Sequence, residues 1–189
     1  MSDKIAIDIA LLPPDEVMDE AIKLNRQFES RFILNNTDHL PHVTLLQAIL
    51  KLEYLPEAKA RLMKIGANFA PLKLRVFVVN KPSAMFEVAR TKQLDNLHNK
   101  VMAEFKDIVS YDVDEKFFYD SHIREKSLDY VRNFLSVTYD NYYPHITLGP
   151  MRLSVKLNLQ FICNRLTICH LGNYNTCRKV LAETSLGKS

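Results

Sequence analysis

The sequence is poor in the features that mark several large classes of protein. It contains three cysteines, an odd number, and all of them lie after residue 160. This argues against a disulfide framework and fits a reducing compartment such as the cytoplasm. No apolar stretch approaches the roughly 20 residues that a membrane-spanning helix needs. The apolar run near the N-terminus meets Pro13 and Pro14 instead of a small-residue cleavage site, so it indicates a strand and no signal peptide. We expect a cytoplasmic protein with no membrane partner.

Patterns that bind metals or cofactors are also missing. The three cysteines and the neighbouring His170 do not follow a zinc spacing such as C-x₂-C, and small buried cysteines on core strands explain them better. No cluster of carboxylates suggests a metal site. His39 lies three residues before His42, which makes a metal pair conceivable, but a solvated loop residue is the better interpretation. We therefore expect no metal and no cofactor.

What the chain does contain is typical of an ordinary globular protein. Hydrophobic residues make up 47% and charged residues 25% of its 189 residues, which fits one domain spanning residues 1–189. The formal net charge of +3 gives only mild support for a polyanionic partner. We expect a monomer.

Hydrophobic periodicity predicts the elements of an α+β domain. Apolar stripes at three- and four-residue spacing predict helices over 15–30, 56–69, 91–109 and 127–136. Alternating β-branched and aromatic residues predict strands over 4–11, 72–79, 84–89, 155–162, 165–171 and 178–183. Because several strands follow one another without a helix between them, we expect antiparallel sheets with helices on their outer faces.

Two nearly identical pentapeptides stand about a hundred residues apart: PHVTL at 41–45 and PHITL at 144–148. In a strand, alternate side chains share a face, so His42 and Thr44 point one way while Val43 and Leu45 point the other. The second copy places His145 and Thr147 together in the same manner. A core strand with a satisfied histidine is the alternative, but a structural strand has no need for the same polar pair twice.

Two imidazoles that face one cleft suit in-line displacement at phosphorus. A neutral histidine removes a proton from the attacking oxygen, and a protonated histidine donates one to the leaving oxygen. Histidine fits both roles because its ordinary pKa lies near 6.5. Threonine hydroxyls can hold the non-bridging phosphate oxygens between the two rings.

The two pentapeptides resemble the paired HxT motifs of the 2H phosphoesterase superfamily, which includes 2′-5′ RNA ligase-like proteins and cyclic nucleotide phosphodiesterases. The resemblance implies a bilobal fold in which two antiparallel sheets, related by pseudo-twofold symmetry, face a central cleft. It also implies hydrolysis of 2′,3′-cyclic or 2′-5′-linked phosphodiesters, with RNA ends or small nucleotides as substrates. The positions that carry over as catalytic residues are His42, Thr44, His145 and Thr147. Two alternatives stay open: RNA ligation, and a nucleotide- or RNA-binding module without turnover.

The chain departs from the superfamily pattern at two places. Many relatives have a basic residue soon after the second motif, where Pro150 and Met151 stand here, and Arg152 is the candidate substitute. Residues 110–142 form a long polar and aromatic insertion. Tyr143 lies two residues before His145, where it would stack on a base or wall the cleft. We therefore name Tyr143 and Arg152 as candidate substrate-binding residues.

Several other polar residues have two interpretations each. Asp8 interrupts an apolar strand, where it would orient a histidine, line the cleft or occupy a partly exposed position. Arg90 and Arg124 are possible phosphate partners, although each is equally well a surface charge. His98 lies off the apolar stripe of its helix, which predicts a surface position.

Overall fold

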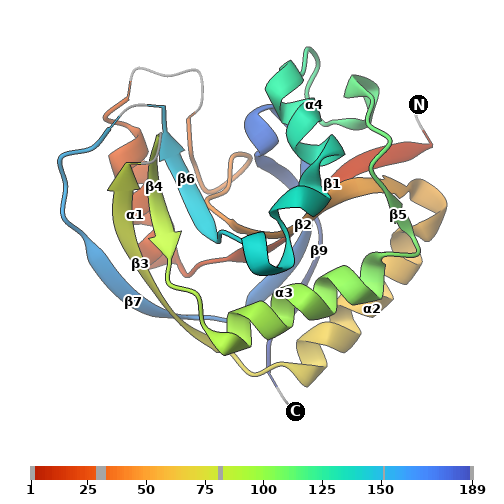
Figure 1. Ribbon diagram of the computed structural model, residues 1–189, viewed down its shortest axis with the longest axis horizontal. Coiled ribbons are helices and arrows are strands. Elements are labelled where there is room, and N and C mark those ends of the chain that lie inside the picture. The colour runs from red at the N-terminus through yellow and green to blue at the C-terminus, as the bar shows by residue number, and fades with distance from the viewer. Residues whose placement is uncertain (1–2, 29–32, 81–82, 151, 188–189) are drawn as a thin grey trace.

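The fold consists of two antiparallel sheets, as a computed structural model shows for residues 3–28, 33–80, 83–150 and 152–187 (Figure 1). The first sheet has the strand order β5-β2-β1-β8-β9 and contains β1 (Lys4–Leu12), β2 (Val43–Lys51), β5 (Val109–Ser110), β8 (Arg165–Leu171) and β9 (Cys177–Ser185). The second has the order β6-β4-β3-β7 and contains β3 (Leu72–Asn80), β4 (Ala84–Val88), β6 (His145–Gly149) and β7 (Asn158–Cys163). The two pentapeptides therefore lie in different sheets.

Four α-helices pack against these sheets: α1 (Asp15–Asn25), α2 (Leu55–Asn68), α3 (Lys92–Phe105) and α4 (Glu125–Arg132). Helix α1 contacts β6 of the second sheet, whereas α2 lies on β8 and β9 and α3 on β2 of the first (Figure 1). Short 3₁₀ helices η1 to η5 occupy Leu52–Tyr54, Glu115–Phe117, Phe134–Val137, Tyr139–Asn141 and Asn173–Asn175. The expected α+β fold with two antiparallel sheets is confirmed. No helix of the described residues is long and apolar enough to cross a membrane.

Strand β1 shows how the sequence pattern builds the centre of the molecule. Ile7, Ile9 and Leu11 are fully buried in the main core, which joins side chains of both sheets with the inner faces of α1, α2 and α3. The alternate residues of β1 face the other way, and among them Asp8 has no exposed surface at all. A carboxylate in this position requires polar partners, and those partners belong to the site described below.

Four predicted elements have a boundary that differs from the structure by three or more residues, because apolar spacing reports burial more directly than backbone conformation. Helix α1 ends at Asn25, residues 26–28 form a turn, and the predicted residues 29–30 lie outside the described ones. Helix α3 ends at Phe105, after which β5 pairs with β2. The helix predicted over 127–136 is α4 followed by the 3₁₀ helix η3, and the strand predicted from 155 begins at Asn158.

Candidate active site

Both motif histidines are held in the same way by the backbone that precedes them. His42 Nδ1 lies 2.7 Å from the carbonyl oxygen of Leu40, and His145 Nδ1 lies 2.8 Å from that of Tyr143. A proline separates each carbonyl from its histidine and fixes the backbone of the turn. Nδ1–H donates to the carbonyl in each case, so Nε2 is left as the nitrogen that can exchange a proton with a substrate.

Each motif strand also has an irregularity at the same position. The pairing of β1 with β2 passes over Leu45, and the pairing of β4 with β6 passes over Leu148, so a β-bulge falls on the last leucine of each motif. A bulge inserts one extra residue and changes which face the following side chains occupy. In β2 this lets Leu45 and Leu46 both be buried while Gln47 turns toward Asp8 on β1.

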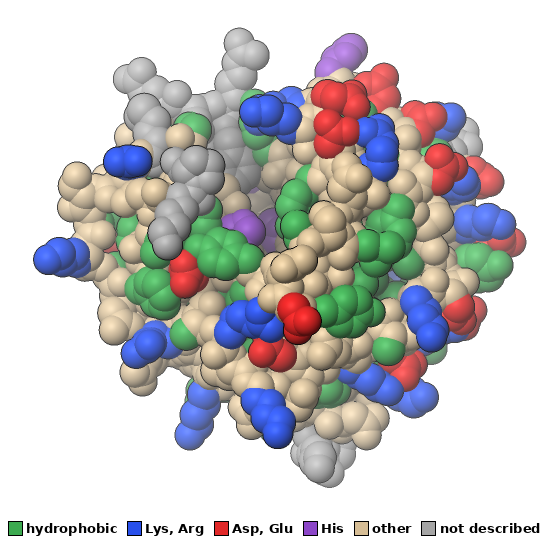
Figure 2. All heavy atoms as spheres, viewed as in Figure 1, with side chains coloured by type: hydrophobic (Ala, Val, Ile, Leu, Met, Phe, Trp, Pro, Cys, Tyr) green, Lys and Arg blue, Asp and Glu red, His purple; other side chains and the backbone are tan. Residues whose placement is uncertain are grey.

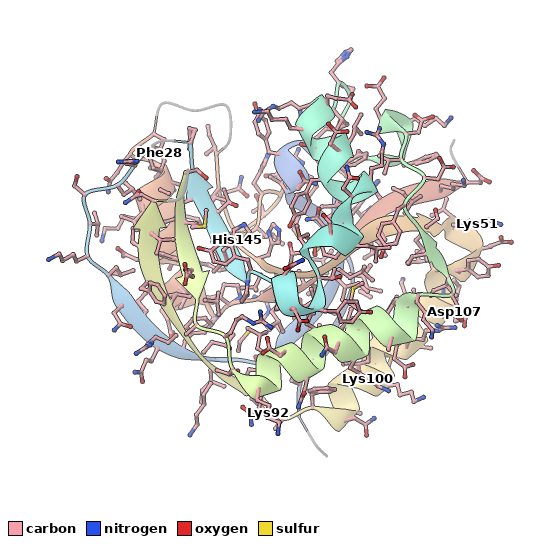
Figure 3. All side chains as sticks on the ribbon, in the orientation of Figure 1. Phe28, Lys51, Lys92, Lys100, Asp107 and His145 are labelled. Atoms are coloured by element: carbon pink, nitrogen blue, oxygen red, sulfur yellow. The ribbon has the colours of Figure 1, made fainter. Side chains whose placement is uncertain are left out.

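The two histidines meet in a pocket of about 190 Å³ between the sheets. His42 lines it from just before β2 and Thr44 from within β2, while His145 and Thr147 line it from β6. Figure 3 shows His145 projecting from β6 toward the space between the sheets, and Figure 2 shows histidine side chains inside a hollow near the middle of this face. The remaining lining residues are Leu34, Leu40, Pro41, Gln47, Tyr130, Ile146, Tyr174, Asn175 and Thr176.

Asp8 binds the residues of the first motif, His42 and Thr44, which form the first half of the site; His145 and Thr147 of the second motif form the second half. Its Oδ2 accepts hydrogen bonds from Thr44 Oγ1 at 2.8 Å and from Gln47 Nε2 at 2.7 Å, and it lies 3.4 Å from His42 Nε2. Gln47 Oε1 in turn accepts from Asn175 Nδ2 at 2.9 Å. Of the three interpretations given to Asp8, a partly exposed position is wrong, because the side chain is fully buried beside the histidine. Gln47 and Asn175 were not predicted, since only the bulge and the η5 turn bring them here.

The surroundings shift the pKa values of the two histidines in opposite directions. Burial lowers the pKa of His42, but the hydrogen bond and negative charge of Asp8 outweigh it, so the pKa is raised above 6.5. Burial lowers the pKa of His145 below 6.5, and the nearby charge of His42 lowers it further. Titratable pairs whose pKa values are driven apart are characteristic of acid–base sites.

The two motif threonines are used differently. Thr44 is half-buried and its hydroxyl donates to Asp8, whereas Thr147 is exposed at the pocket and its hydroxyl has no partner among the described residues. The identical motif thus gives one threonine that belongs to the Asp8 network and one that is available to a ligand.

A second recess of about 150 Å³ adjoins the first and shares Thr44, Tyr130 and His145 with it. Its other walls are Phe134, Val137, Asn141, Tyr142 and Tyr143, so the insertion at 110–142 supplies much of it. The Tyr143 ring lies 5.5 Å from the His145 ring, and its hydroxyl donates to Glu87. Burial and the Glu87 carboxylate raise the pKa of Tyr143 to about 12, so the phenol stays protonated.

None of the three candidate arginines lines either recess. Arg152 is exposed, and Arg90 donates to the backbone of residues 139 and 140 and pairs with Asp95. Arg124 stacks over the ring of Tyr174, 4.5 Å from its centroid, and Tyr174 does line the main pocket. Among the described residues that line the two recesses, the histidines are thus the basic side chains.

His98 corrects a sequence prediction. It is buried with 1% of its surface exposed, where a surface position was expected. Its Nδ1 donates to the carbonyl of Leu45 at 2.9 Å, its Nε2 accepts from the backbone N–H of Tyr139 at 3.1 Å, and its ring stacks on Tyr142 with centroids 3.9 Å apart. Burial lowers the pKa of His98, consistent with this neutral ring. His98 therefore connects Leu45, at the bulge of the first motif, to Tyr139 and Tyr142 of the insertion.

Solved structures provide the comparison with known proteins. TT0787 of Thermus thermophilus matches 98% of this chain and 100% of its own with a TM-score of 0.63 and 16% identity. Escherichia coli LigT complexed with NADP+ matches 97% of this chain and 98% of its own with a TM-score of 0.52 and 12% identity. The LigT complex with 3′-AMP gives a TM-score of 0.50 at 12% identity, covering 98% and 99%. The fold is the 2H phosphoesterase fold.

At these identities the likeness shows the 2H fold alone. No protein-family model matches the chain, and no curated protein sequence does so. The 2H fold is nevertheless what the two HxT motifs led us to expect, and this expectation of the fold is confirmed.

Proposed function

We propose that the protein is a phosphoesterase of the 2H type, which hydrolyses 2′,3′-cyclic phosphate or 2′-5′ phosphodiester bonds of RNA or nucleotides without a metal ion. The observation that carries the proposal is the pair of histidines at one pocket, each with Nδ1 bonded to a carbonyl and with pKa values shifted in opposite directions. Such a pair presents a base and an acid to one substrate at neutral pH.

The pKa directions assign the roles. His145, whose pKa is lowered, is neutral near pH 7 and takes a proton from the attacking water as the new O–P bond forms. His42, whose pKa is raised, is protonated and donates to the leaving ribose oxygen as its P–O bond breaks. The reaction ends with the proton on His145, and exchange with solvent restores the starting state. For ligation the two roles are reversed.

A nucleotide fits the rest of the site. The hydroxyl of Thr147 can donate to a non-bridging phosphate oxygen, and the tyrosine-walled recess beside His145 offers aromatic rings on which a base can stack. The structures of LigT with NADP+ and with 3′-AMP are of a protein with this fold bound to nucleotides, which supports the same class of ligand here. The cytoplasm is the expected location.

The test is a substrate panel with product identification. We would incubate the protein with 2′,3′-cyclic nucleotides, 2′-5′-linked oligonucleotides and RNA ending in 2′,3′-cyclic phosphate, in the presence of a chelator. Hydrolysis of at least one substrate supports the proposal, and the product, a 2′- or 3′-phosphate, identifies the bond that was broken.

The same panel separates the alternatives. Joining of cyclic-phosphate ends to 5′-hydroxyl ends would assign the protein as a ligase. Tight binding of these nucleotides without any product would overturn the enzymatic proposal in favour of a binding module.

A further inference from the structure

We infer that His42, Asp8 and Cys177 form a binding site for a zinc-like divalent cation, and that occupation of this site switches off the proposed reaction. One ligand atom from each of the three side chains lies within 4.8 Å of the other two. Sulfur, imidazole nitrogen and carboxylate oxygen together are a ligand set of Zn²⁺ and related transition metals.

The inhibitory part of the inference rests on the proposed function, whereas the cation site does not.

The spacing of these atoms suits a tetrahedral ion. Zn–N and Zn–O bonds of about 2.0–2.1 Å place two tetrahedral ligands about 3.3 Å apart. Asp8 Oδ2, which also accepts hydrogen bonds from Thr44 and Gln47, lies 3.4 Å from His42 Nε2. A thiolate ligand sits slightly farther out because the Zn–S bond is about 2.3 Å, and Cys177 Sγ, within 4.8 Å of the other two ligand atoms, has to move by roughly 1 Å to complete the set.

The backbone already holds Cys177 beside the histidine. The N–H of Leu40 donates to the carbonyl of Cys177 at 3.1 Å, while the carbonyl of Leu40 accepts from His42 Nδ1. One residue therefore fixes both ligands, at an isolated bridge between the approach to β2 and the start of β9. Sequence spacing gave no sign of this group, because 135 residues separate His42 from Cys177.

Two independent features show that the group is prepared for a ligand. Metal-ligating histidines almost always donate their other ring N–H to a backbone carbonyl or carboxylate, and His42 does so through Nδ1. Asp8 is fully buried, and its Oδ1 has no hydrogen-bond partner among the described residues. An unsatisfied buried carboxylate oxygen is costly, and a cation bound to the Asp8 carboxylate would offset that cost.

The charges of the three ligands define the kind of ion, and the role of His42 Nε2 defines the effect of binding on the reaction. A carboxylate, a thiolate and a neutral imidazole carry two negative charges, which balance one divalent cation. Binding displaces the thiol proton of Cys177 and any proton on His42 Nε2 to solvent. Because the ion then occupies the lone pair of Nε2, His42 has no proton to give to a leaving oxygen, and the reaction stops.

The experiment uses the full chain and Co²⁺ as a spectroscopic probe, with Zn²⁺ as competitor. Binding of Co²⁺ to a thiolate gives a charge-transfer absorption band, which we expect in the wild type and which Zn²⁺ should abolish. Mutation of a residue that only supports a metal ligand costs about 10–100-fold in affinity, so loss of a ligand itself in Cys177→Ser or Asp8→Asn should weaken binding by about 100-fold or more. Cys163→Ser is the matched control, because Cys163 is equally buried but bonds to the carbonyl of Leu12. Circular dichroism checks that each variant folds, with Cys177→Ala as the second substitution.

Each outcome decides one point. No thiolate band in the wild type, or a band that survives in folded Cys177→Ser and Cys177→Ala, would overturn the site. A band that is lost instead in Cys169→Ser would assign the thiolate to the neighbouring strand and likewise overturn it. A metal-binding wild type without activity on any substrate would refute the proposed function and leave the site standing. An active enzyme that Zn²⁺ does not inhibit would refute the switch.

Discussion

The two halves of the site share a sequence motif, a backbone geometry and a bulge, yet they differ in electrostatics. In each, a carbonyl two residues upstream binds Nδ1 of the histidine, and the final leucine is passed over in the strand pairing. The first half rests on a buried carboxylate, Asp8, which binds Thr44 and lies beside His42. In the second half, the acid paired with His145 across the strands is Glu87, whose carboxylate accepts a hydrogen bond from Tyr143.

This difference teaches that the repeated motif supplies the geometry of each histidine, whereas the protonation state depends on burial and on the charges around each ring. β1 runs beside β2 and contributes Asp8, whereas β4 runs beside β6 and contributes Glu87 opposite His145. Asp8 biases His42 toward the charged form, whereas burial and the charge of His42 lower the pKa of His145 and bias it toward the neutral form, although Glu87 acts in the opposite direction. A symmetric pair of motifs becomes an asymmetric acid and base.

Removing either histidine should produce the largest effect. His42→Ala and His145→Ala each delete one proton-transfer group, and general acid–base catalysis is worth about 10²–10⁴-fold in rate. We expect kcat to fall by that factor for both variants on the best substrate of the panel, measured by steady-state kinetics. His122→Asn is the control, because His122 is exposed and its positive φ of 59° is tolerated by asparagine. Full turnover by both alanine variants would rule out the two-histidine mechanism.

The second-largest expected effect is a change in the pH profile, which tests the difference between the two histidines. His145 must be neutral, so kcat/KM should rise as the pH increases through the pKa of His145, which lies below 6.5. His42 must be protonated, so kcat/KM should fall as pH passes its pKa, above 6.5. Asp8→Asn removes the charge that raises the pKa of His42. The alkaline limb should therefore move to lower pH, and kcat/KM on that limb should drop about tenfold for every pH unit that the limb moves.

The matched control for this variant is Asp112→Asn, a neutralisation of an exposed carboxylate that pairs with Lys4 at 3.6 Å. It removes the same charge far from the histidines and should leave both limbs in place. If Asp8→Asn moved the acidic limb instead, the roles assigned to His42 and His145 would have to be exchanged.

Much of this site followed from the sequence because its determinants are local. Strand alternation places a histidine and a threonine on one face, and the proline before each histidine sets the turn, so the pairs His42–Thr44 and His145–Thr147 could be found from two pentapeptides. The α+β fold followed from element order and the resemblance. Their meeting in one pocket is a matter of topology, since β2 and β6 lie in different sheets.

The parts that sequence reasoning missed depend on contacts between distant residues. Gln47 reaches Asp8 only because the bulge at Leu45 interrupts the alternation on which the strand prediction relied. His98 was assigned to the surface because its helix stripe excludes it, but the insertion folds over α3 and buries it. No periodicity within a helix can report a partner that covers its polar face.

Tyr143 offers a smaller effect that concerns substrate binding in the second half. Stacking of a base on an aromatic ring contributes about 1–3 kcal/mol, and the half-exposed ring of Tyr143 should give the lower end of this range. Tyr143→Ala should raise KM about fivefold for a nucleotide substrate with little change in kcat, whereas Tyr143→Phe, which keeps the ring but loses the bond to Glu87, should retain the KM. Equal KM values for all three proteins would remove Tyr143 from the binding site.

The smallest effect on activity should come from His98, whose role is to hold the first half in place. His98→Leu leaves the Leu45 carbonyl and the Tyr139 N–H without their buried partner, and each unsatisfied group costs about 1–3 kcal/mol. Urea unfolding should show a loss of stability of that order, while kcat falls only about twofold because no reacting atom is touched. His98→Asn, which can restore one of the two hydrogen bonds, should recover part of the stability. A His98→Leu variant as stable as the wild type would mean that the bulge of the first motif is held by its own strand pairing and needs no clamp.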